Sequence, residues 1–121
     1  MMAPTIALSA AGGPRLVLGS AGSARLRGAI MQVAVNVLGH GLGVAQAIDA
    51  PRIHLEGPVL HCEGGHDPEA LARLSALGYG LVGWRRRNLY FGGAAAVEVL
   101  RGGRRAAAGD PRRGGAGLVV G

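Results

Sequence analysis

The chain has 121 residues, of which 49% are hydrophobic but only 3% aromatic, and 23 are glycine, so it has the size of one ordinary domain with many turns. All 13 basic residues are arginine and give a formal net charge of +6, but they are spread along the chain with few aromatics to stack on bases, which argues against nucleic-acid binding. A single cysteine, Cys62, excludes an internal disulfide and is expected as a small buried side chain. No apolar run reaches the roughly 18 residues that a membrane-spanning helix needs, and the start lacks the pattern of a signal peptide.

The first third of the chain predicts a hairpin followed by a long helix. Thr5–Ala10 and Arg15–Gly19 are apolar strands joined by a turn rich in glycine and proline. Ser23 or a neighbour is expected to cap the next helix, which ends near Gly39. Its apolar residues recur at helical spacing and predict a helix buried against the sheet: Leu26, Ile30, Val33 and Val37.

The middle of the chain predicts a second, short helix, two strands and a third helix. Gly43–Ala50 is the short helix, because Pro51 must end it. Ile53–Glu56 and Val59–Glu63 alternate apolar and polar residues, as half-exposed strands do. Asp67 followed by proline predicts the start of the third helix, with a buried face formed by Leu71, Leu74 and Leu77.

The last third predicts further strands separated by loops. Leu81–Arg86 and Ala94–Leu100 are strands, Arg101–Arg105 turns into Ala106–Gly109, and a glycine-rich loop precedes a final apolar run at Leu118–Val120, the last strand. The resulting order, ββααββαβββ, predicts an α+β fold in which helices pack on one side of a mostly antiparallel sheet.

The stretch Leu16–Arg27 is the strongest candidate for a functional site. A short apolar strand runs through a glycine-containing turn directly into a helix. Backbone N–H groups are free at the first turn of a helix, where the positive end of the helix dipole also lies. An anion, or an oxyanion formed during a reaction, would be stabilised there, although such turns also occur without any site.

Four stretches together resemble one enzyme family. They are Ala3-Pro4-Thr5, Gly19–Arg25 (Gly-Ser-Ala-Gly-Ser-Ala-Arg), Asp49–His54 (Asp-Ala-Pro-Arg-Ile-His) and Asp110–Arg113 (Asp-Pro-Arg-Arg). In order and separation they resemble the C-terminal part of the small subunit of gamma-glutamyltranspeptidases, also called gamma-glutamyltransferases or glutathione hydrolases. The resemblance covers essentially the whole chain. It implies that residues 1–121 form a single partial domain, part of the αββα sandwich of N-terminal nucleophile hydrolases.

The resemblance also implies where the chemistry would lie. The family's oxyanion hole maps to the backbone N–H groups of Gly22 and Ser23, the second of which is usually glycine. The family nucleophile is the N-terminal threonine of the small subunit; Thr5 is not that residue, so the chain contains no nucleophile. Met1 stands where the family has a substrate-binding serine, which leaves the substrate-binding residues unknown.

The function implied is cleavage of the gamma-glutamyl amide bond of glutathione-like substrates, with transfer of the acyl group to water or an amino acid. The nucleophile would come from the rest of the same precursor, the large subunit and the N-terminal part of the small subunit, so this chain alone is expected to be inactive. No cofactor is expected, and the family implies a periplasmic or extracellular location. The alternatives are a non-catalytic scaffold or binding module derived from the family and, third, a small basic nucleic-acid binder.

The remaining polar residues favour structural roles. The four histidines lack the spacing of a zinc motif, so no metal site is expected. Arg52 and Asp49 are expected to hold the turn at Pro51, and Asp110 with Arg112 to fix the loop before the last strand. Arg25, a cation at a helix start, requires an acidic partner from either the substrate or the protein.

Overall fold

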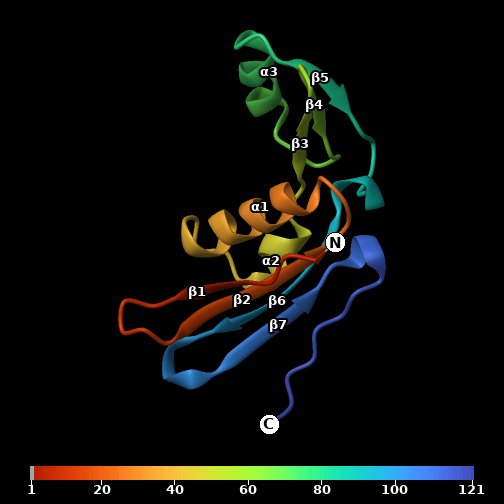
Figure 1. The fold of residues 1–121 in the computed structure, drawn as a ribbon. Helices are drawn as coiled ribbons and strands as arrows, with labels where there is room; N and C mark the ends of the chain where they lie inside the picture. Colours follow the sequence, from red (N-terminus) through yellow and green to blue (C-terminus); the bar gives the residue numbers. More distant parts are fainter. Residues whose placement is uncertain (1) are drawn as a thin grey trace.

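The computed structural model describes residues 2–121, and its main element is a four-stranded antiparallel sheet. The strands are β1 (Thr5–Leu8), β2 (Pro14–Ala21), β6 (Gly93–Val99) and β7 (Arg105–Gly109), in the order β1-β2-β6-β7. The predicted hairpin is therefore β1 and β2, although β2 is longer at both ends than expected. Strands far apart in sequence pair at the centre, where β2 meets β6 (Figure 1).

One side of this sheet carries the core. Side chains alternate along a strand, and Leu16 and Leu18 of β2 point to the same side as their neighbours Ala94 and Ala96 of β6. All four are at most 5% exposed. They form one cluster with apolar residues of the two helices that cover this side.

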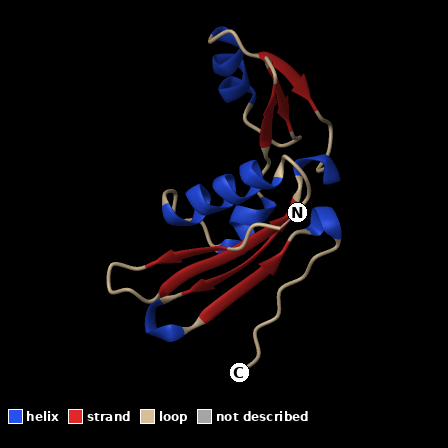
Figure 2. Cartoon of the chain, viewed as in Figure 1, coloured by secondary structure: helices blue, strands red, loops and turns tan. Residues whose placement is uncertain are grey.

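Helices α1 (Leu26–Leu38) and α2 (Val44–Asp49) lie on that side of the sheet (Figure 2). The predicted stripe is correct at its centre, since Val33 and Val37 are at most 1% exposed. The rest of the helix is also largely apolar, but burial holds on one side only, since the outward residues Met31, Val35 and Leu38 are 61%, 48% and 39% exposed. No side chain caps the N-terminus of α1, so the predicted cap by Ser23 is also wrong.

A smaller three-stranded sheet extends from the ends of these helices (Figure 1). It contains β3 (Ile53–Glu56), β4 (Val59–Cys62) and β5 (Gly80–Gly83). Strands β3 and β4 are antiparallel, whereas β4 and β5 are parallel because α3 (Pro68–Ala76) connects them as a crossover. The α+β prediction is confirmed, but the strands form two sheets rather than one.

Helix α3 begins as predicted and packs less tightly than predicted. The carboxylate of Asp67 accepts a hydrogen bond from the Glu69 N–H at 3.0 Å, and Pro68 occupies the first turn. No residue of α3 is fully buried, and Leu77 lies beyond the helix with 75% of its surface exposed. The smaller sheet therefore has little core of its own, apart from Leu60 and the buried Cys62.

Three short 3-10 helices complete the chain: η1 (Leu89–Phe91), η2 (Arg101–Gly103) and η3 (Pro111–Arg113). The strand predicted at Leu118–Val120 is not formed, because this segment pairs with no strand and its side chains are 84%, 48% and 77% exposed. The last strand is instead β7. Within residues 2–121, no helix is long and apolar enough to cross a membrane.

The second side of the four-stranded sheet is not covered by a helix, and we call it the open face. Its residues alternate with those of the core: Ile6, Leu8, Val17, Ala95 and Val97. The four large ones among them are between 37% and 63% exposed. An apolar face of this kind is normally covered by another layer.

Candidate functional site

The turn between β2 and α1 brings Gly22 and Ser23 to the end of the four-stranded sheet. Gly22 has a φ of 150°, and a Cβ placed on it would lie 4.0 Å from the Cα of Gly92, so the two glycines pass close to each other. Ser23 does not have a positive φ, because every positive φ among residues 2–121 belongs to a glycine. Serine is therefore compatible with the backbone at this position, where the resemblance implies glycine.

Hydrogen bonds and close packing fix the position of this turn. The Ser20 hydroxyl donates to the Gly93 carbonyl at 2.7 Å, which ties the end of β2 to the start of β6. A Cβ on Gly92, whose φ is 76°, would lie 3.7 Å from that of Ala29 in α1. The turn, the first two turns of α1 and the start of β6 thus hold one another in place.

Gly22 and Ser23 line a cavity of about 420 Å³, which we call the turn cavity. The other residues that line it come from the helix start, from the segment that leads into β6, and from η3: Arg25, Trp84, Asn88, Leu89, Tyr90, Gly92 and Arg113. The two predicted oxyanion residues therefore face a space that a small molecule could occupy.

The acidic partner predicted for Arg25 is a residue of the protein, Glu56 of β3. A guanidinium nitrogen of Arg25 lies 3.4 Å from a Glu56 carboxylate oxygen, and the guanidinium carbon lies 3.8 Å from the centre of the Tyr90 ring. The Tyr90 hydroxyl donates to the same Glu56 oxygen at 2.7 Å. Contact with Tyr90 and with Glu56 raises the pKa of Arg25 and keeps it charged. Arg25 thus joins α1 to the smaller sheet.

Two rings of an aromatic cluster, those of Trp84 and Tyr90, line the turn cavity. The rings of Trp84 and Tyr90 stack with their centres 4.7 Å apart, and Phe91 meets both edge-on. The indole N–H of Trp84 donates to Nδ1 of His61 at 3.3 Å. Sequence reasoning did not identify this cluster, because its residues lie on β4, on the loop after β5 and in η1, with no common spacing.

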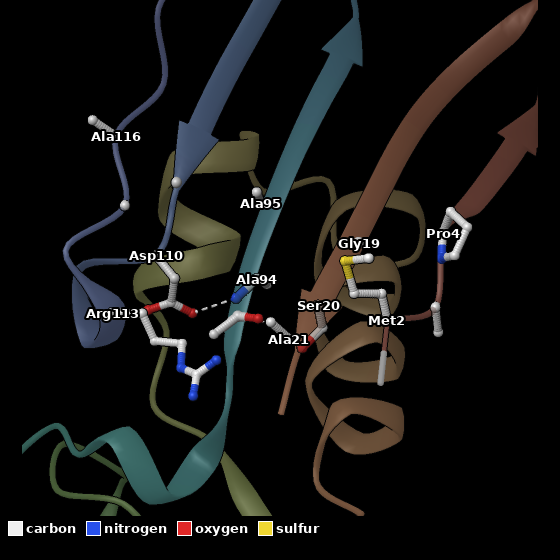
Figure 3. Close-up of a pocket in the computed structure, with 14 residues that line it drawn as sticks. Met2, Pro4, Gly19, Ser20, Ala21, Ala94, Ala95, Asp110, Arg113 and Ala116 are labelled. Atoms are coloured by element: carbon white, nitrogen blue, oxygen red, sulfur yellow. Dashed lines mark hydrogen bonds between the residues drawn. The ribbon is translucent and has the colours of Figure 1, made fainter. Parts of the chain in front are cut away.

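A second cavity of about 460 Å³, the sheet cavity, lies at the end of the sheet beside the turn. Figure 3 shows Met2 and Pro4 on one side and Asp110, Arg113 and Ala116 on the other, with Ala21 and Ala94 between them. Most of its lining is small and apolar. Arg113 lines both this cavity and the turn cavity, so its side chain separates the two.

Behind the cavities, two arginines and two carboxylates form a buried ion-pair network. Arg52 pairs with Asp110 at 2.7 Å, and Arg112 pairs with Asp110 at 3.2 Å and with Glu63 at hydrogen-bond distance. None of the four is more than 9% exposed. The interpretation of Asp110 and Arg112 as a loop-fixing pair is confirmed. Arg52 is buried and pairs with Asp110, whereas Asp49 forms a surface pair with Arg87 at 3.3 Å.

The network also satisfies backbone groups from four segments. Glu63 accepts hydrogen bonds from the N–H groups of Arg52 and Asn88, at 3.0 and 2.8 Å. Asp110 accepts one from the N–H of Ala94 at 2.9 Å, and Arg112 donates to the carbonyls of Ile48 and Ala50 at 2.8 and 2.9 Å. These backbone groups belong to the end of α2 with the turn after it, to the segment before η1, to the start of β6 and to η3, where the Arg112 N–H donates to Asp110 at 2.9 Å.

Both carboxylates of the network are held ionised. Burial by itself would raise the pKa of Glu63, but hydrogen bonds from Arg112 and from the Asn88 amide outweigh it and lower that pKa. The pKa of Asp110 is also lowered, because the Arg112 N–H and the Arg52 charge outweigh the effect of burial. Charge is therefore maintained in a place where an unpaired ion would be costly.

The remaining residues singled out in the sequence are Thr5, Met1 and the possible metal ligands. Thr5 lies in β1, and Met1 lies outside the described residues. In the described part of the chain, no three histidine, cysteine, aspartate or glutamate side chains are grouped so that they could hold a metal ion.

Comparison with known proteins identifies the family. The sequence matches the Gamma-glutamyltranspeptidase family over residues 1–120. It is 39% identical over 79 residues to the glutathione hydrolase proenzyme of Escherichia coli (strain K12), a match that covers 64% of this chain and 13% of that protein. It is 38% identical over 82 residues to the acylase ACY 1 proenzyme of Pseudomonas sp. (strain SE83), covering 67% of this chain and 14% of the relative.

The fold is similar to that of solved family members. The crystal structure of an acivicin-inhibited gamma-glutamyltranspeptidase superposes with a TM-score of 0.80 and 29% identity, over 93% of this chain and 61% of that one. The chain thus spans only a small part of its curated relatives and about three fifths of a solved chain. On the match of residues 1–120, together with the shared fold, the chain belongs to the gamma-glutamyltranspeptidase family.

Proposed function

We propose that this chain is the C-terminal segment of a gamma-glutamyltransferase or glutathione hydrolase. In this proposal the enzyme cleaves the gamma-glutamyl amide bond of glutathione-like substrates and passes the acyl group to water or to an amino acid. The observation that carries the proposal is the Gly22-Ser23 turn, which faces a cavity in a chain of this family.

The role of the turn is to stabilise the oxyanion that forms when the amide carbonyl is attacked. Backbone N–H groups from Gly22 and Ser23 would donate to the carbonyl oxygen as it gains negative charge, which is where such donors have their largest effect. The hydrogen bond from Ser20 to Gly93 supports this role, because it holds the end of β2 in place during the reaction.

The nucleophilic threonine and the rest of the substrate site would come from the remainder of the same precursor. Both curated relatives are proenzymes, which supports a precursor of this kind. The open face of the four-stranded sheet and the adjoining sheet cavity are apolar and lie beside the turn. They would receive the preceding segment as the second sheet of a sandwich.

A substitution that removes one backbone N–H tests the proposal in the full-length precursor. Ser23→Pro lacks the N–H, and because Ser23 does not have a positive φ, the proline ring is not excluded by the backbone. We expect kcat for release of p-nitroaniline from gamma-glutamyl-p-nitroanilide to fall about 100-fold to 1,000-fold. Ser23→Ala keeps the N–H and should stay within about twofold of the parent, since the hydroxyl has no role.

Processing and folding of Ser23→Pro must first be shown by the appearance of both subunits on a denaturing gel. If the processed variant retains parental kcat, the oxyanion role of Ser23 is wrong. If the parent precursor does not cleave gamma-glutamyl-p-nitroanilide at all, the gamma-glutamyl assignment is wrong, and either an amidase for another acyl group or the scaffold alternative replaces it.

The similarity to the acylase ACY 1 proenzyme favours a second candidate, an amidase that acts on another acyl group. The same oxyanion turn would serve either reaction. Glutaryl-p-nitroanilide differs from the gamma-glutamyl compound only by the missing α-amino group. A higher kcat/KM for the glutaryl compound would favour the acylase, and the opposite preference would favour the gamma-glutamyl enzyme.

A further inference from the structure

The turn cavity contains two arginines, and only one of them has its charge satisfied. Arg25 is paired with Glu56 and stacked on Tyr90. Arg113, in the part of the chain that the structure describes, forms no ion pair with a carboxylate. A cation that lines the turn cavity is therefore available to a ligand.

The backbone that carries Arg113 is firmly held. Its neighbour Arg112 is bound by Glu63 and Asp110 in the buried network, and the Arg113 N–H donates to the Asp110 carbonyl at 3.1 Å. Arg113 thus projects from a fixed position, although its own side chain is exposed.

The stem of the Arg113 side chain crosses β6 at Gly93. A Cβ on Gly93 would overlap the Cδ of Arg113 and lie 2.7 Å from its Cγ, so only glycine leaves room for the stem. Figure 3 shows the guanidinium continuing past Ala94 into the space at the end of the sheet. This route carries the charge to the boundary between the turn cavity and the sheet cavity, beside the Gly22-Ser23 turn.

The chemistry of this position fits one part of a substrate. In the proposed function the scissile carbonyl lies at the turn, and we assign the adjoining space to the amine side of the amide, by which the leaving group departs and an acceptor enters. A guanidinium recognises a carboxylate with charge-assisted hydrogen bonds, and Trp84 and Tyr90 line the same cavity as Arg113.

We propose that Arg113 determines specificity on the amine side of the reaction, by binding the terminal carboxylate of a peptide-like leaving group or acceptor in the turn cavity. The inference rests on the proposed function and assigns a residue and a ligand class to the space beside the oxyanion turn. It predicts that the enzyme distinguishes amines that carry a carboxylate from those that do not.

The test compares substrates with and without that carboxylate in the full-length, processed enzyme. Arg113→Gln keeps the Cβ, Cγ and a third stem position over Gly93 but removes the charge. We expect kcat/KM for glutathione to fall about tenfold and that for gamma-glutamyl-p-nitroanilide to stay within about twofold. The KM for glycylglycine as acceptor should rise about tenfold, while that for glycylglycinamide stays unchanged, and Arg113→Lys should restore part of the difference.

Arg104→Gln is the matched control, because Arg104 is exposed at the opposite end of the sheet in the turn between β6 and β7. It should alter none of these values. The inference is overturned if Arg113→Gln lowers activity on all substrates equally, or leaves cleavage of glutathione unaffected.

If the parent enzyme cleaves no gamma-glutamyl amide, the proposed function fails separately. In that case, saturation-transfer NMR compares the binding of glycylglycine and glycylglycinamide. Preference of the parent for glycylglycine, lost in Arg113→Gln, supports the role of Arg113, and equal binding by the parent overturns it.

Discussion

At the residue scale, the buried network of Arg52, Glu63, Asp110 and Arg112 is the feature most sensitive to substitution. Each carboxylate is paired with arginine and also accepts backbone hydrogen bonds from separate segments. Removing one charge leaves the opposing arginine buried without its partner, which is more costly than the pair is stabilising. The network therefore acts as a junction between the two sheets.

Glu63→Gln should lower the free energy of unfolding of the processed enzyme by about 3 kcal/mol or more. Asp49→Asn removes a carboxylate whose pair with Arg87 lies at the surface, with both side chains more than 40% exposed, and should cost less than about 1 kcal/mol. Urea denaturation of the two variants measures the difference. Equal midpoints would show that the buried network contributes no more than the surface pair.

The same carboxylates predict how stability depends on pH. The pKa values of Glu63 and Asp110 are lowered in the folded protein, so their contribution is complete above the unfolded pKa of about 4 and is lost as the pH falls through the lower folded values. We expect the urea midpoint to decline steeply below about pH 4. The decline should be shallower in Glu63→Gln, which no longer titrates at that position. A flat profile from pH 7 to pH 3 would contradict this.

The sequence identifies individual residues of this region better than it identifies their partners. Asp110 and Arg112 are two residues apart, so their pairing can be inferred from a local turn. Glu63 lies 49 residues from Arg112, and no local pattern connects them. Likewise the acidic partner of Arg25 is required by the helix start, but its identity as Glu56 depends on how the smaller sheet docks.

At the element scale, the periodicity of apolar residues predicts correctly the helices and strands that pack against the core. The hairpin and the buried stripe of α1 follow from apolar residues that repeat at strand and helix spacing, and the start of α3 follows from its capping residue and proline. The failures concern segments in which an apolar pattern finds no core. Leu77 and the final run 118–120 are apolar but exposed, and neither belongs to a helix or a strand.

The start of β6 offers an element-scale test that does not change any charge. Gly93→Ala places a methyl group where the stem of Arg113 now lies, and because that side chain is flexible, the arginine should move rather than the strand. We expect a Tm within a few degrees of the parent together with the substrate profile of Arg113→Gln. Gly83→Ala, in β5 of the smaller sheet with nothing within 4 Å of the added Cβ, is the control and should change neither property.

If Gly93→Ala keeps the parental preference for glutathione over gamma-glutamyl-p-nitroanilide, then the route of the Arg113 stem over Gly93 is not what places its charge. Loss of both activities with a large fall in Tm would instead show that the strand itself has shifted.

At the scale of the whole molecule, the two faces of the four-stranded sheet differ in what covers them. One face is covered by α1 and α2, whereas the open face exposes Ile6, Leu8 and Val17. Apolar area of this extent in water favours association with another apolar layer. We therefore expect the open face to be covered in the complete protein.

Val17→Glu places a charge on the open face and should reduce the yield of soluble, processed enzyme severalfold, because the charge would be buried on assembly. Met31→Glu introduces the same change on the outer side of α1, where the side chain is 61% exposed, and should have little effect. Size-exclusion chromatography of the two precursors measures the yield. Normal assembly of Val17→Glu would show that this face stays in contact with water.

The glycines that follow η3 carry a consequence for how this sheet meets other chains. After η3 the backbone returns along β7 so closely that a Cβ on Gly109 would overlap the backbone at Ala116, and one on Gly117 would overlap that at Ala107. A strand at the border of a sheet is otherwise a template onto which a foreign strand can add, the first step in many forms of aggregation. Residues 115–117 lie along the edge of β7, so the addition of a strand from another chain is disfavoured at this edge. A side chain at Gly109 or Gly117 would push this segment away and expose the edge.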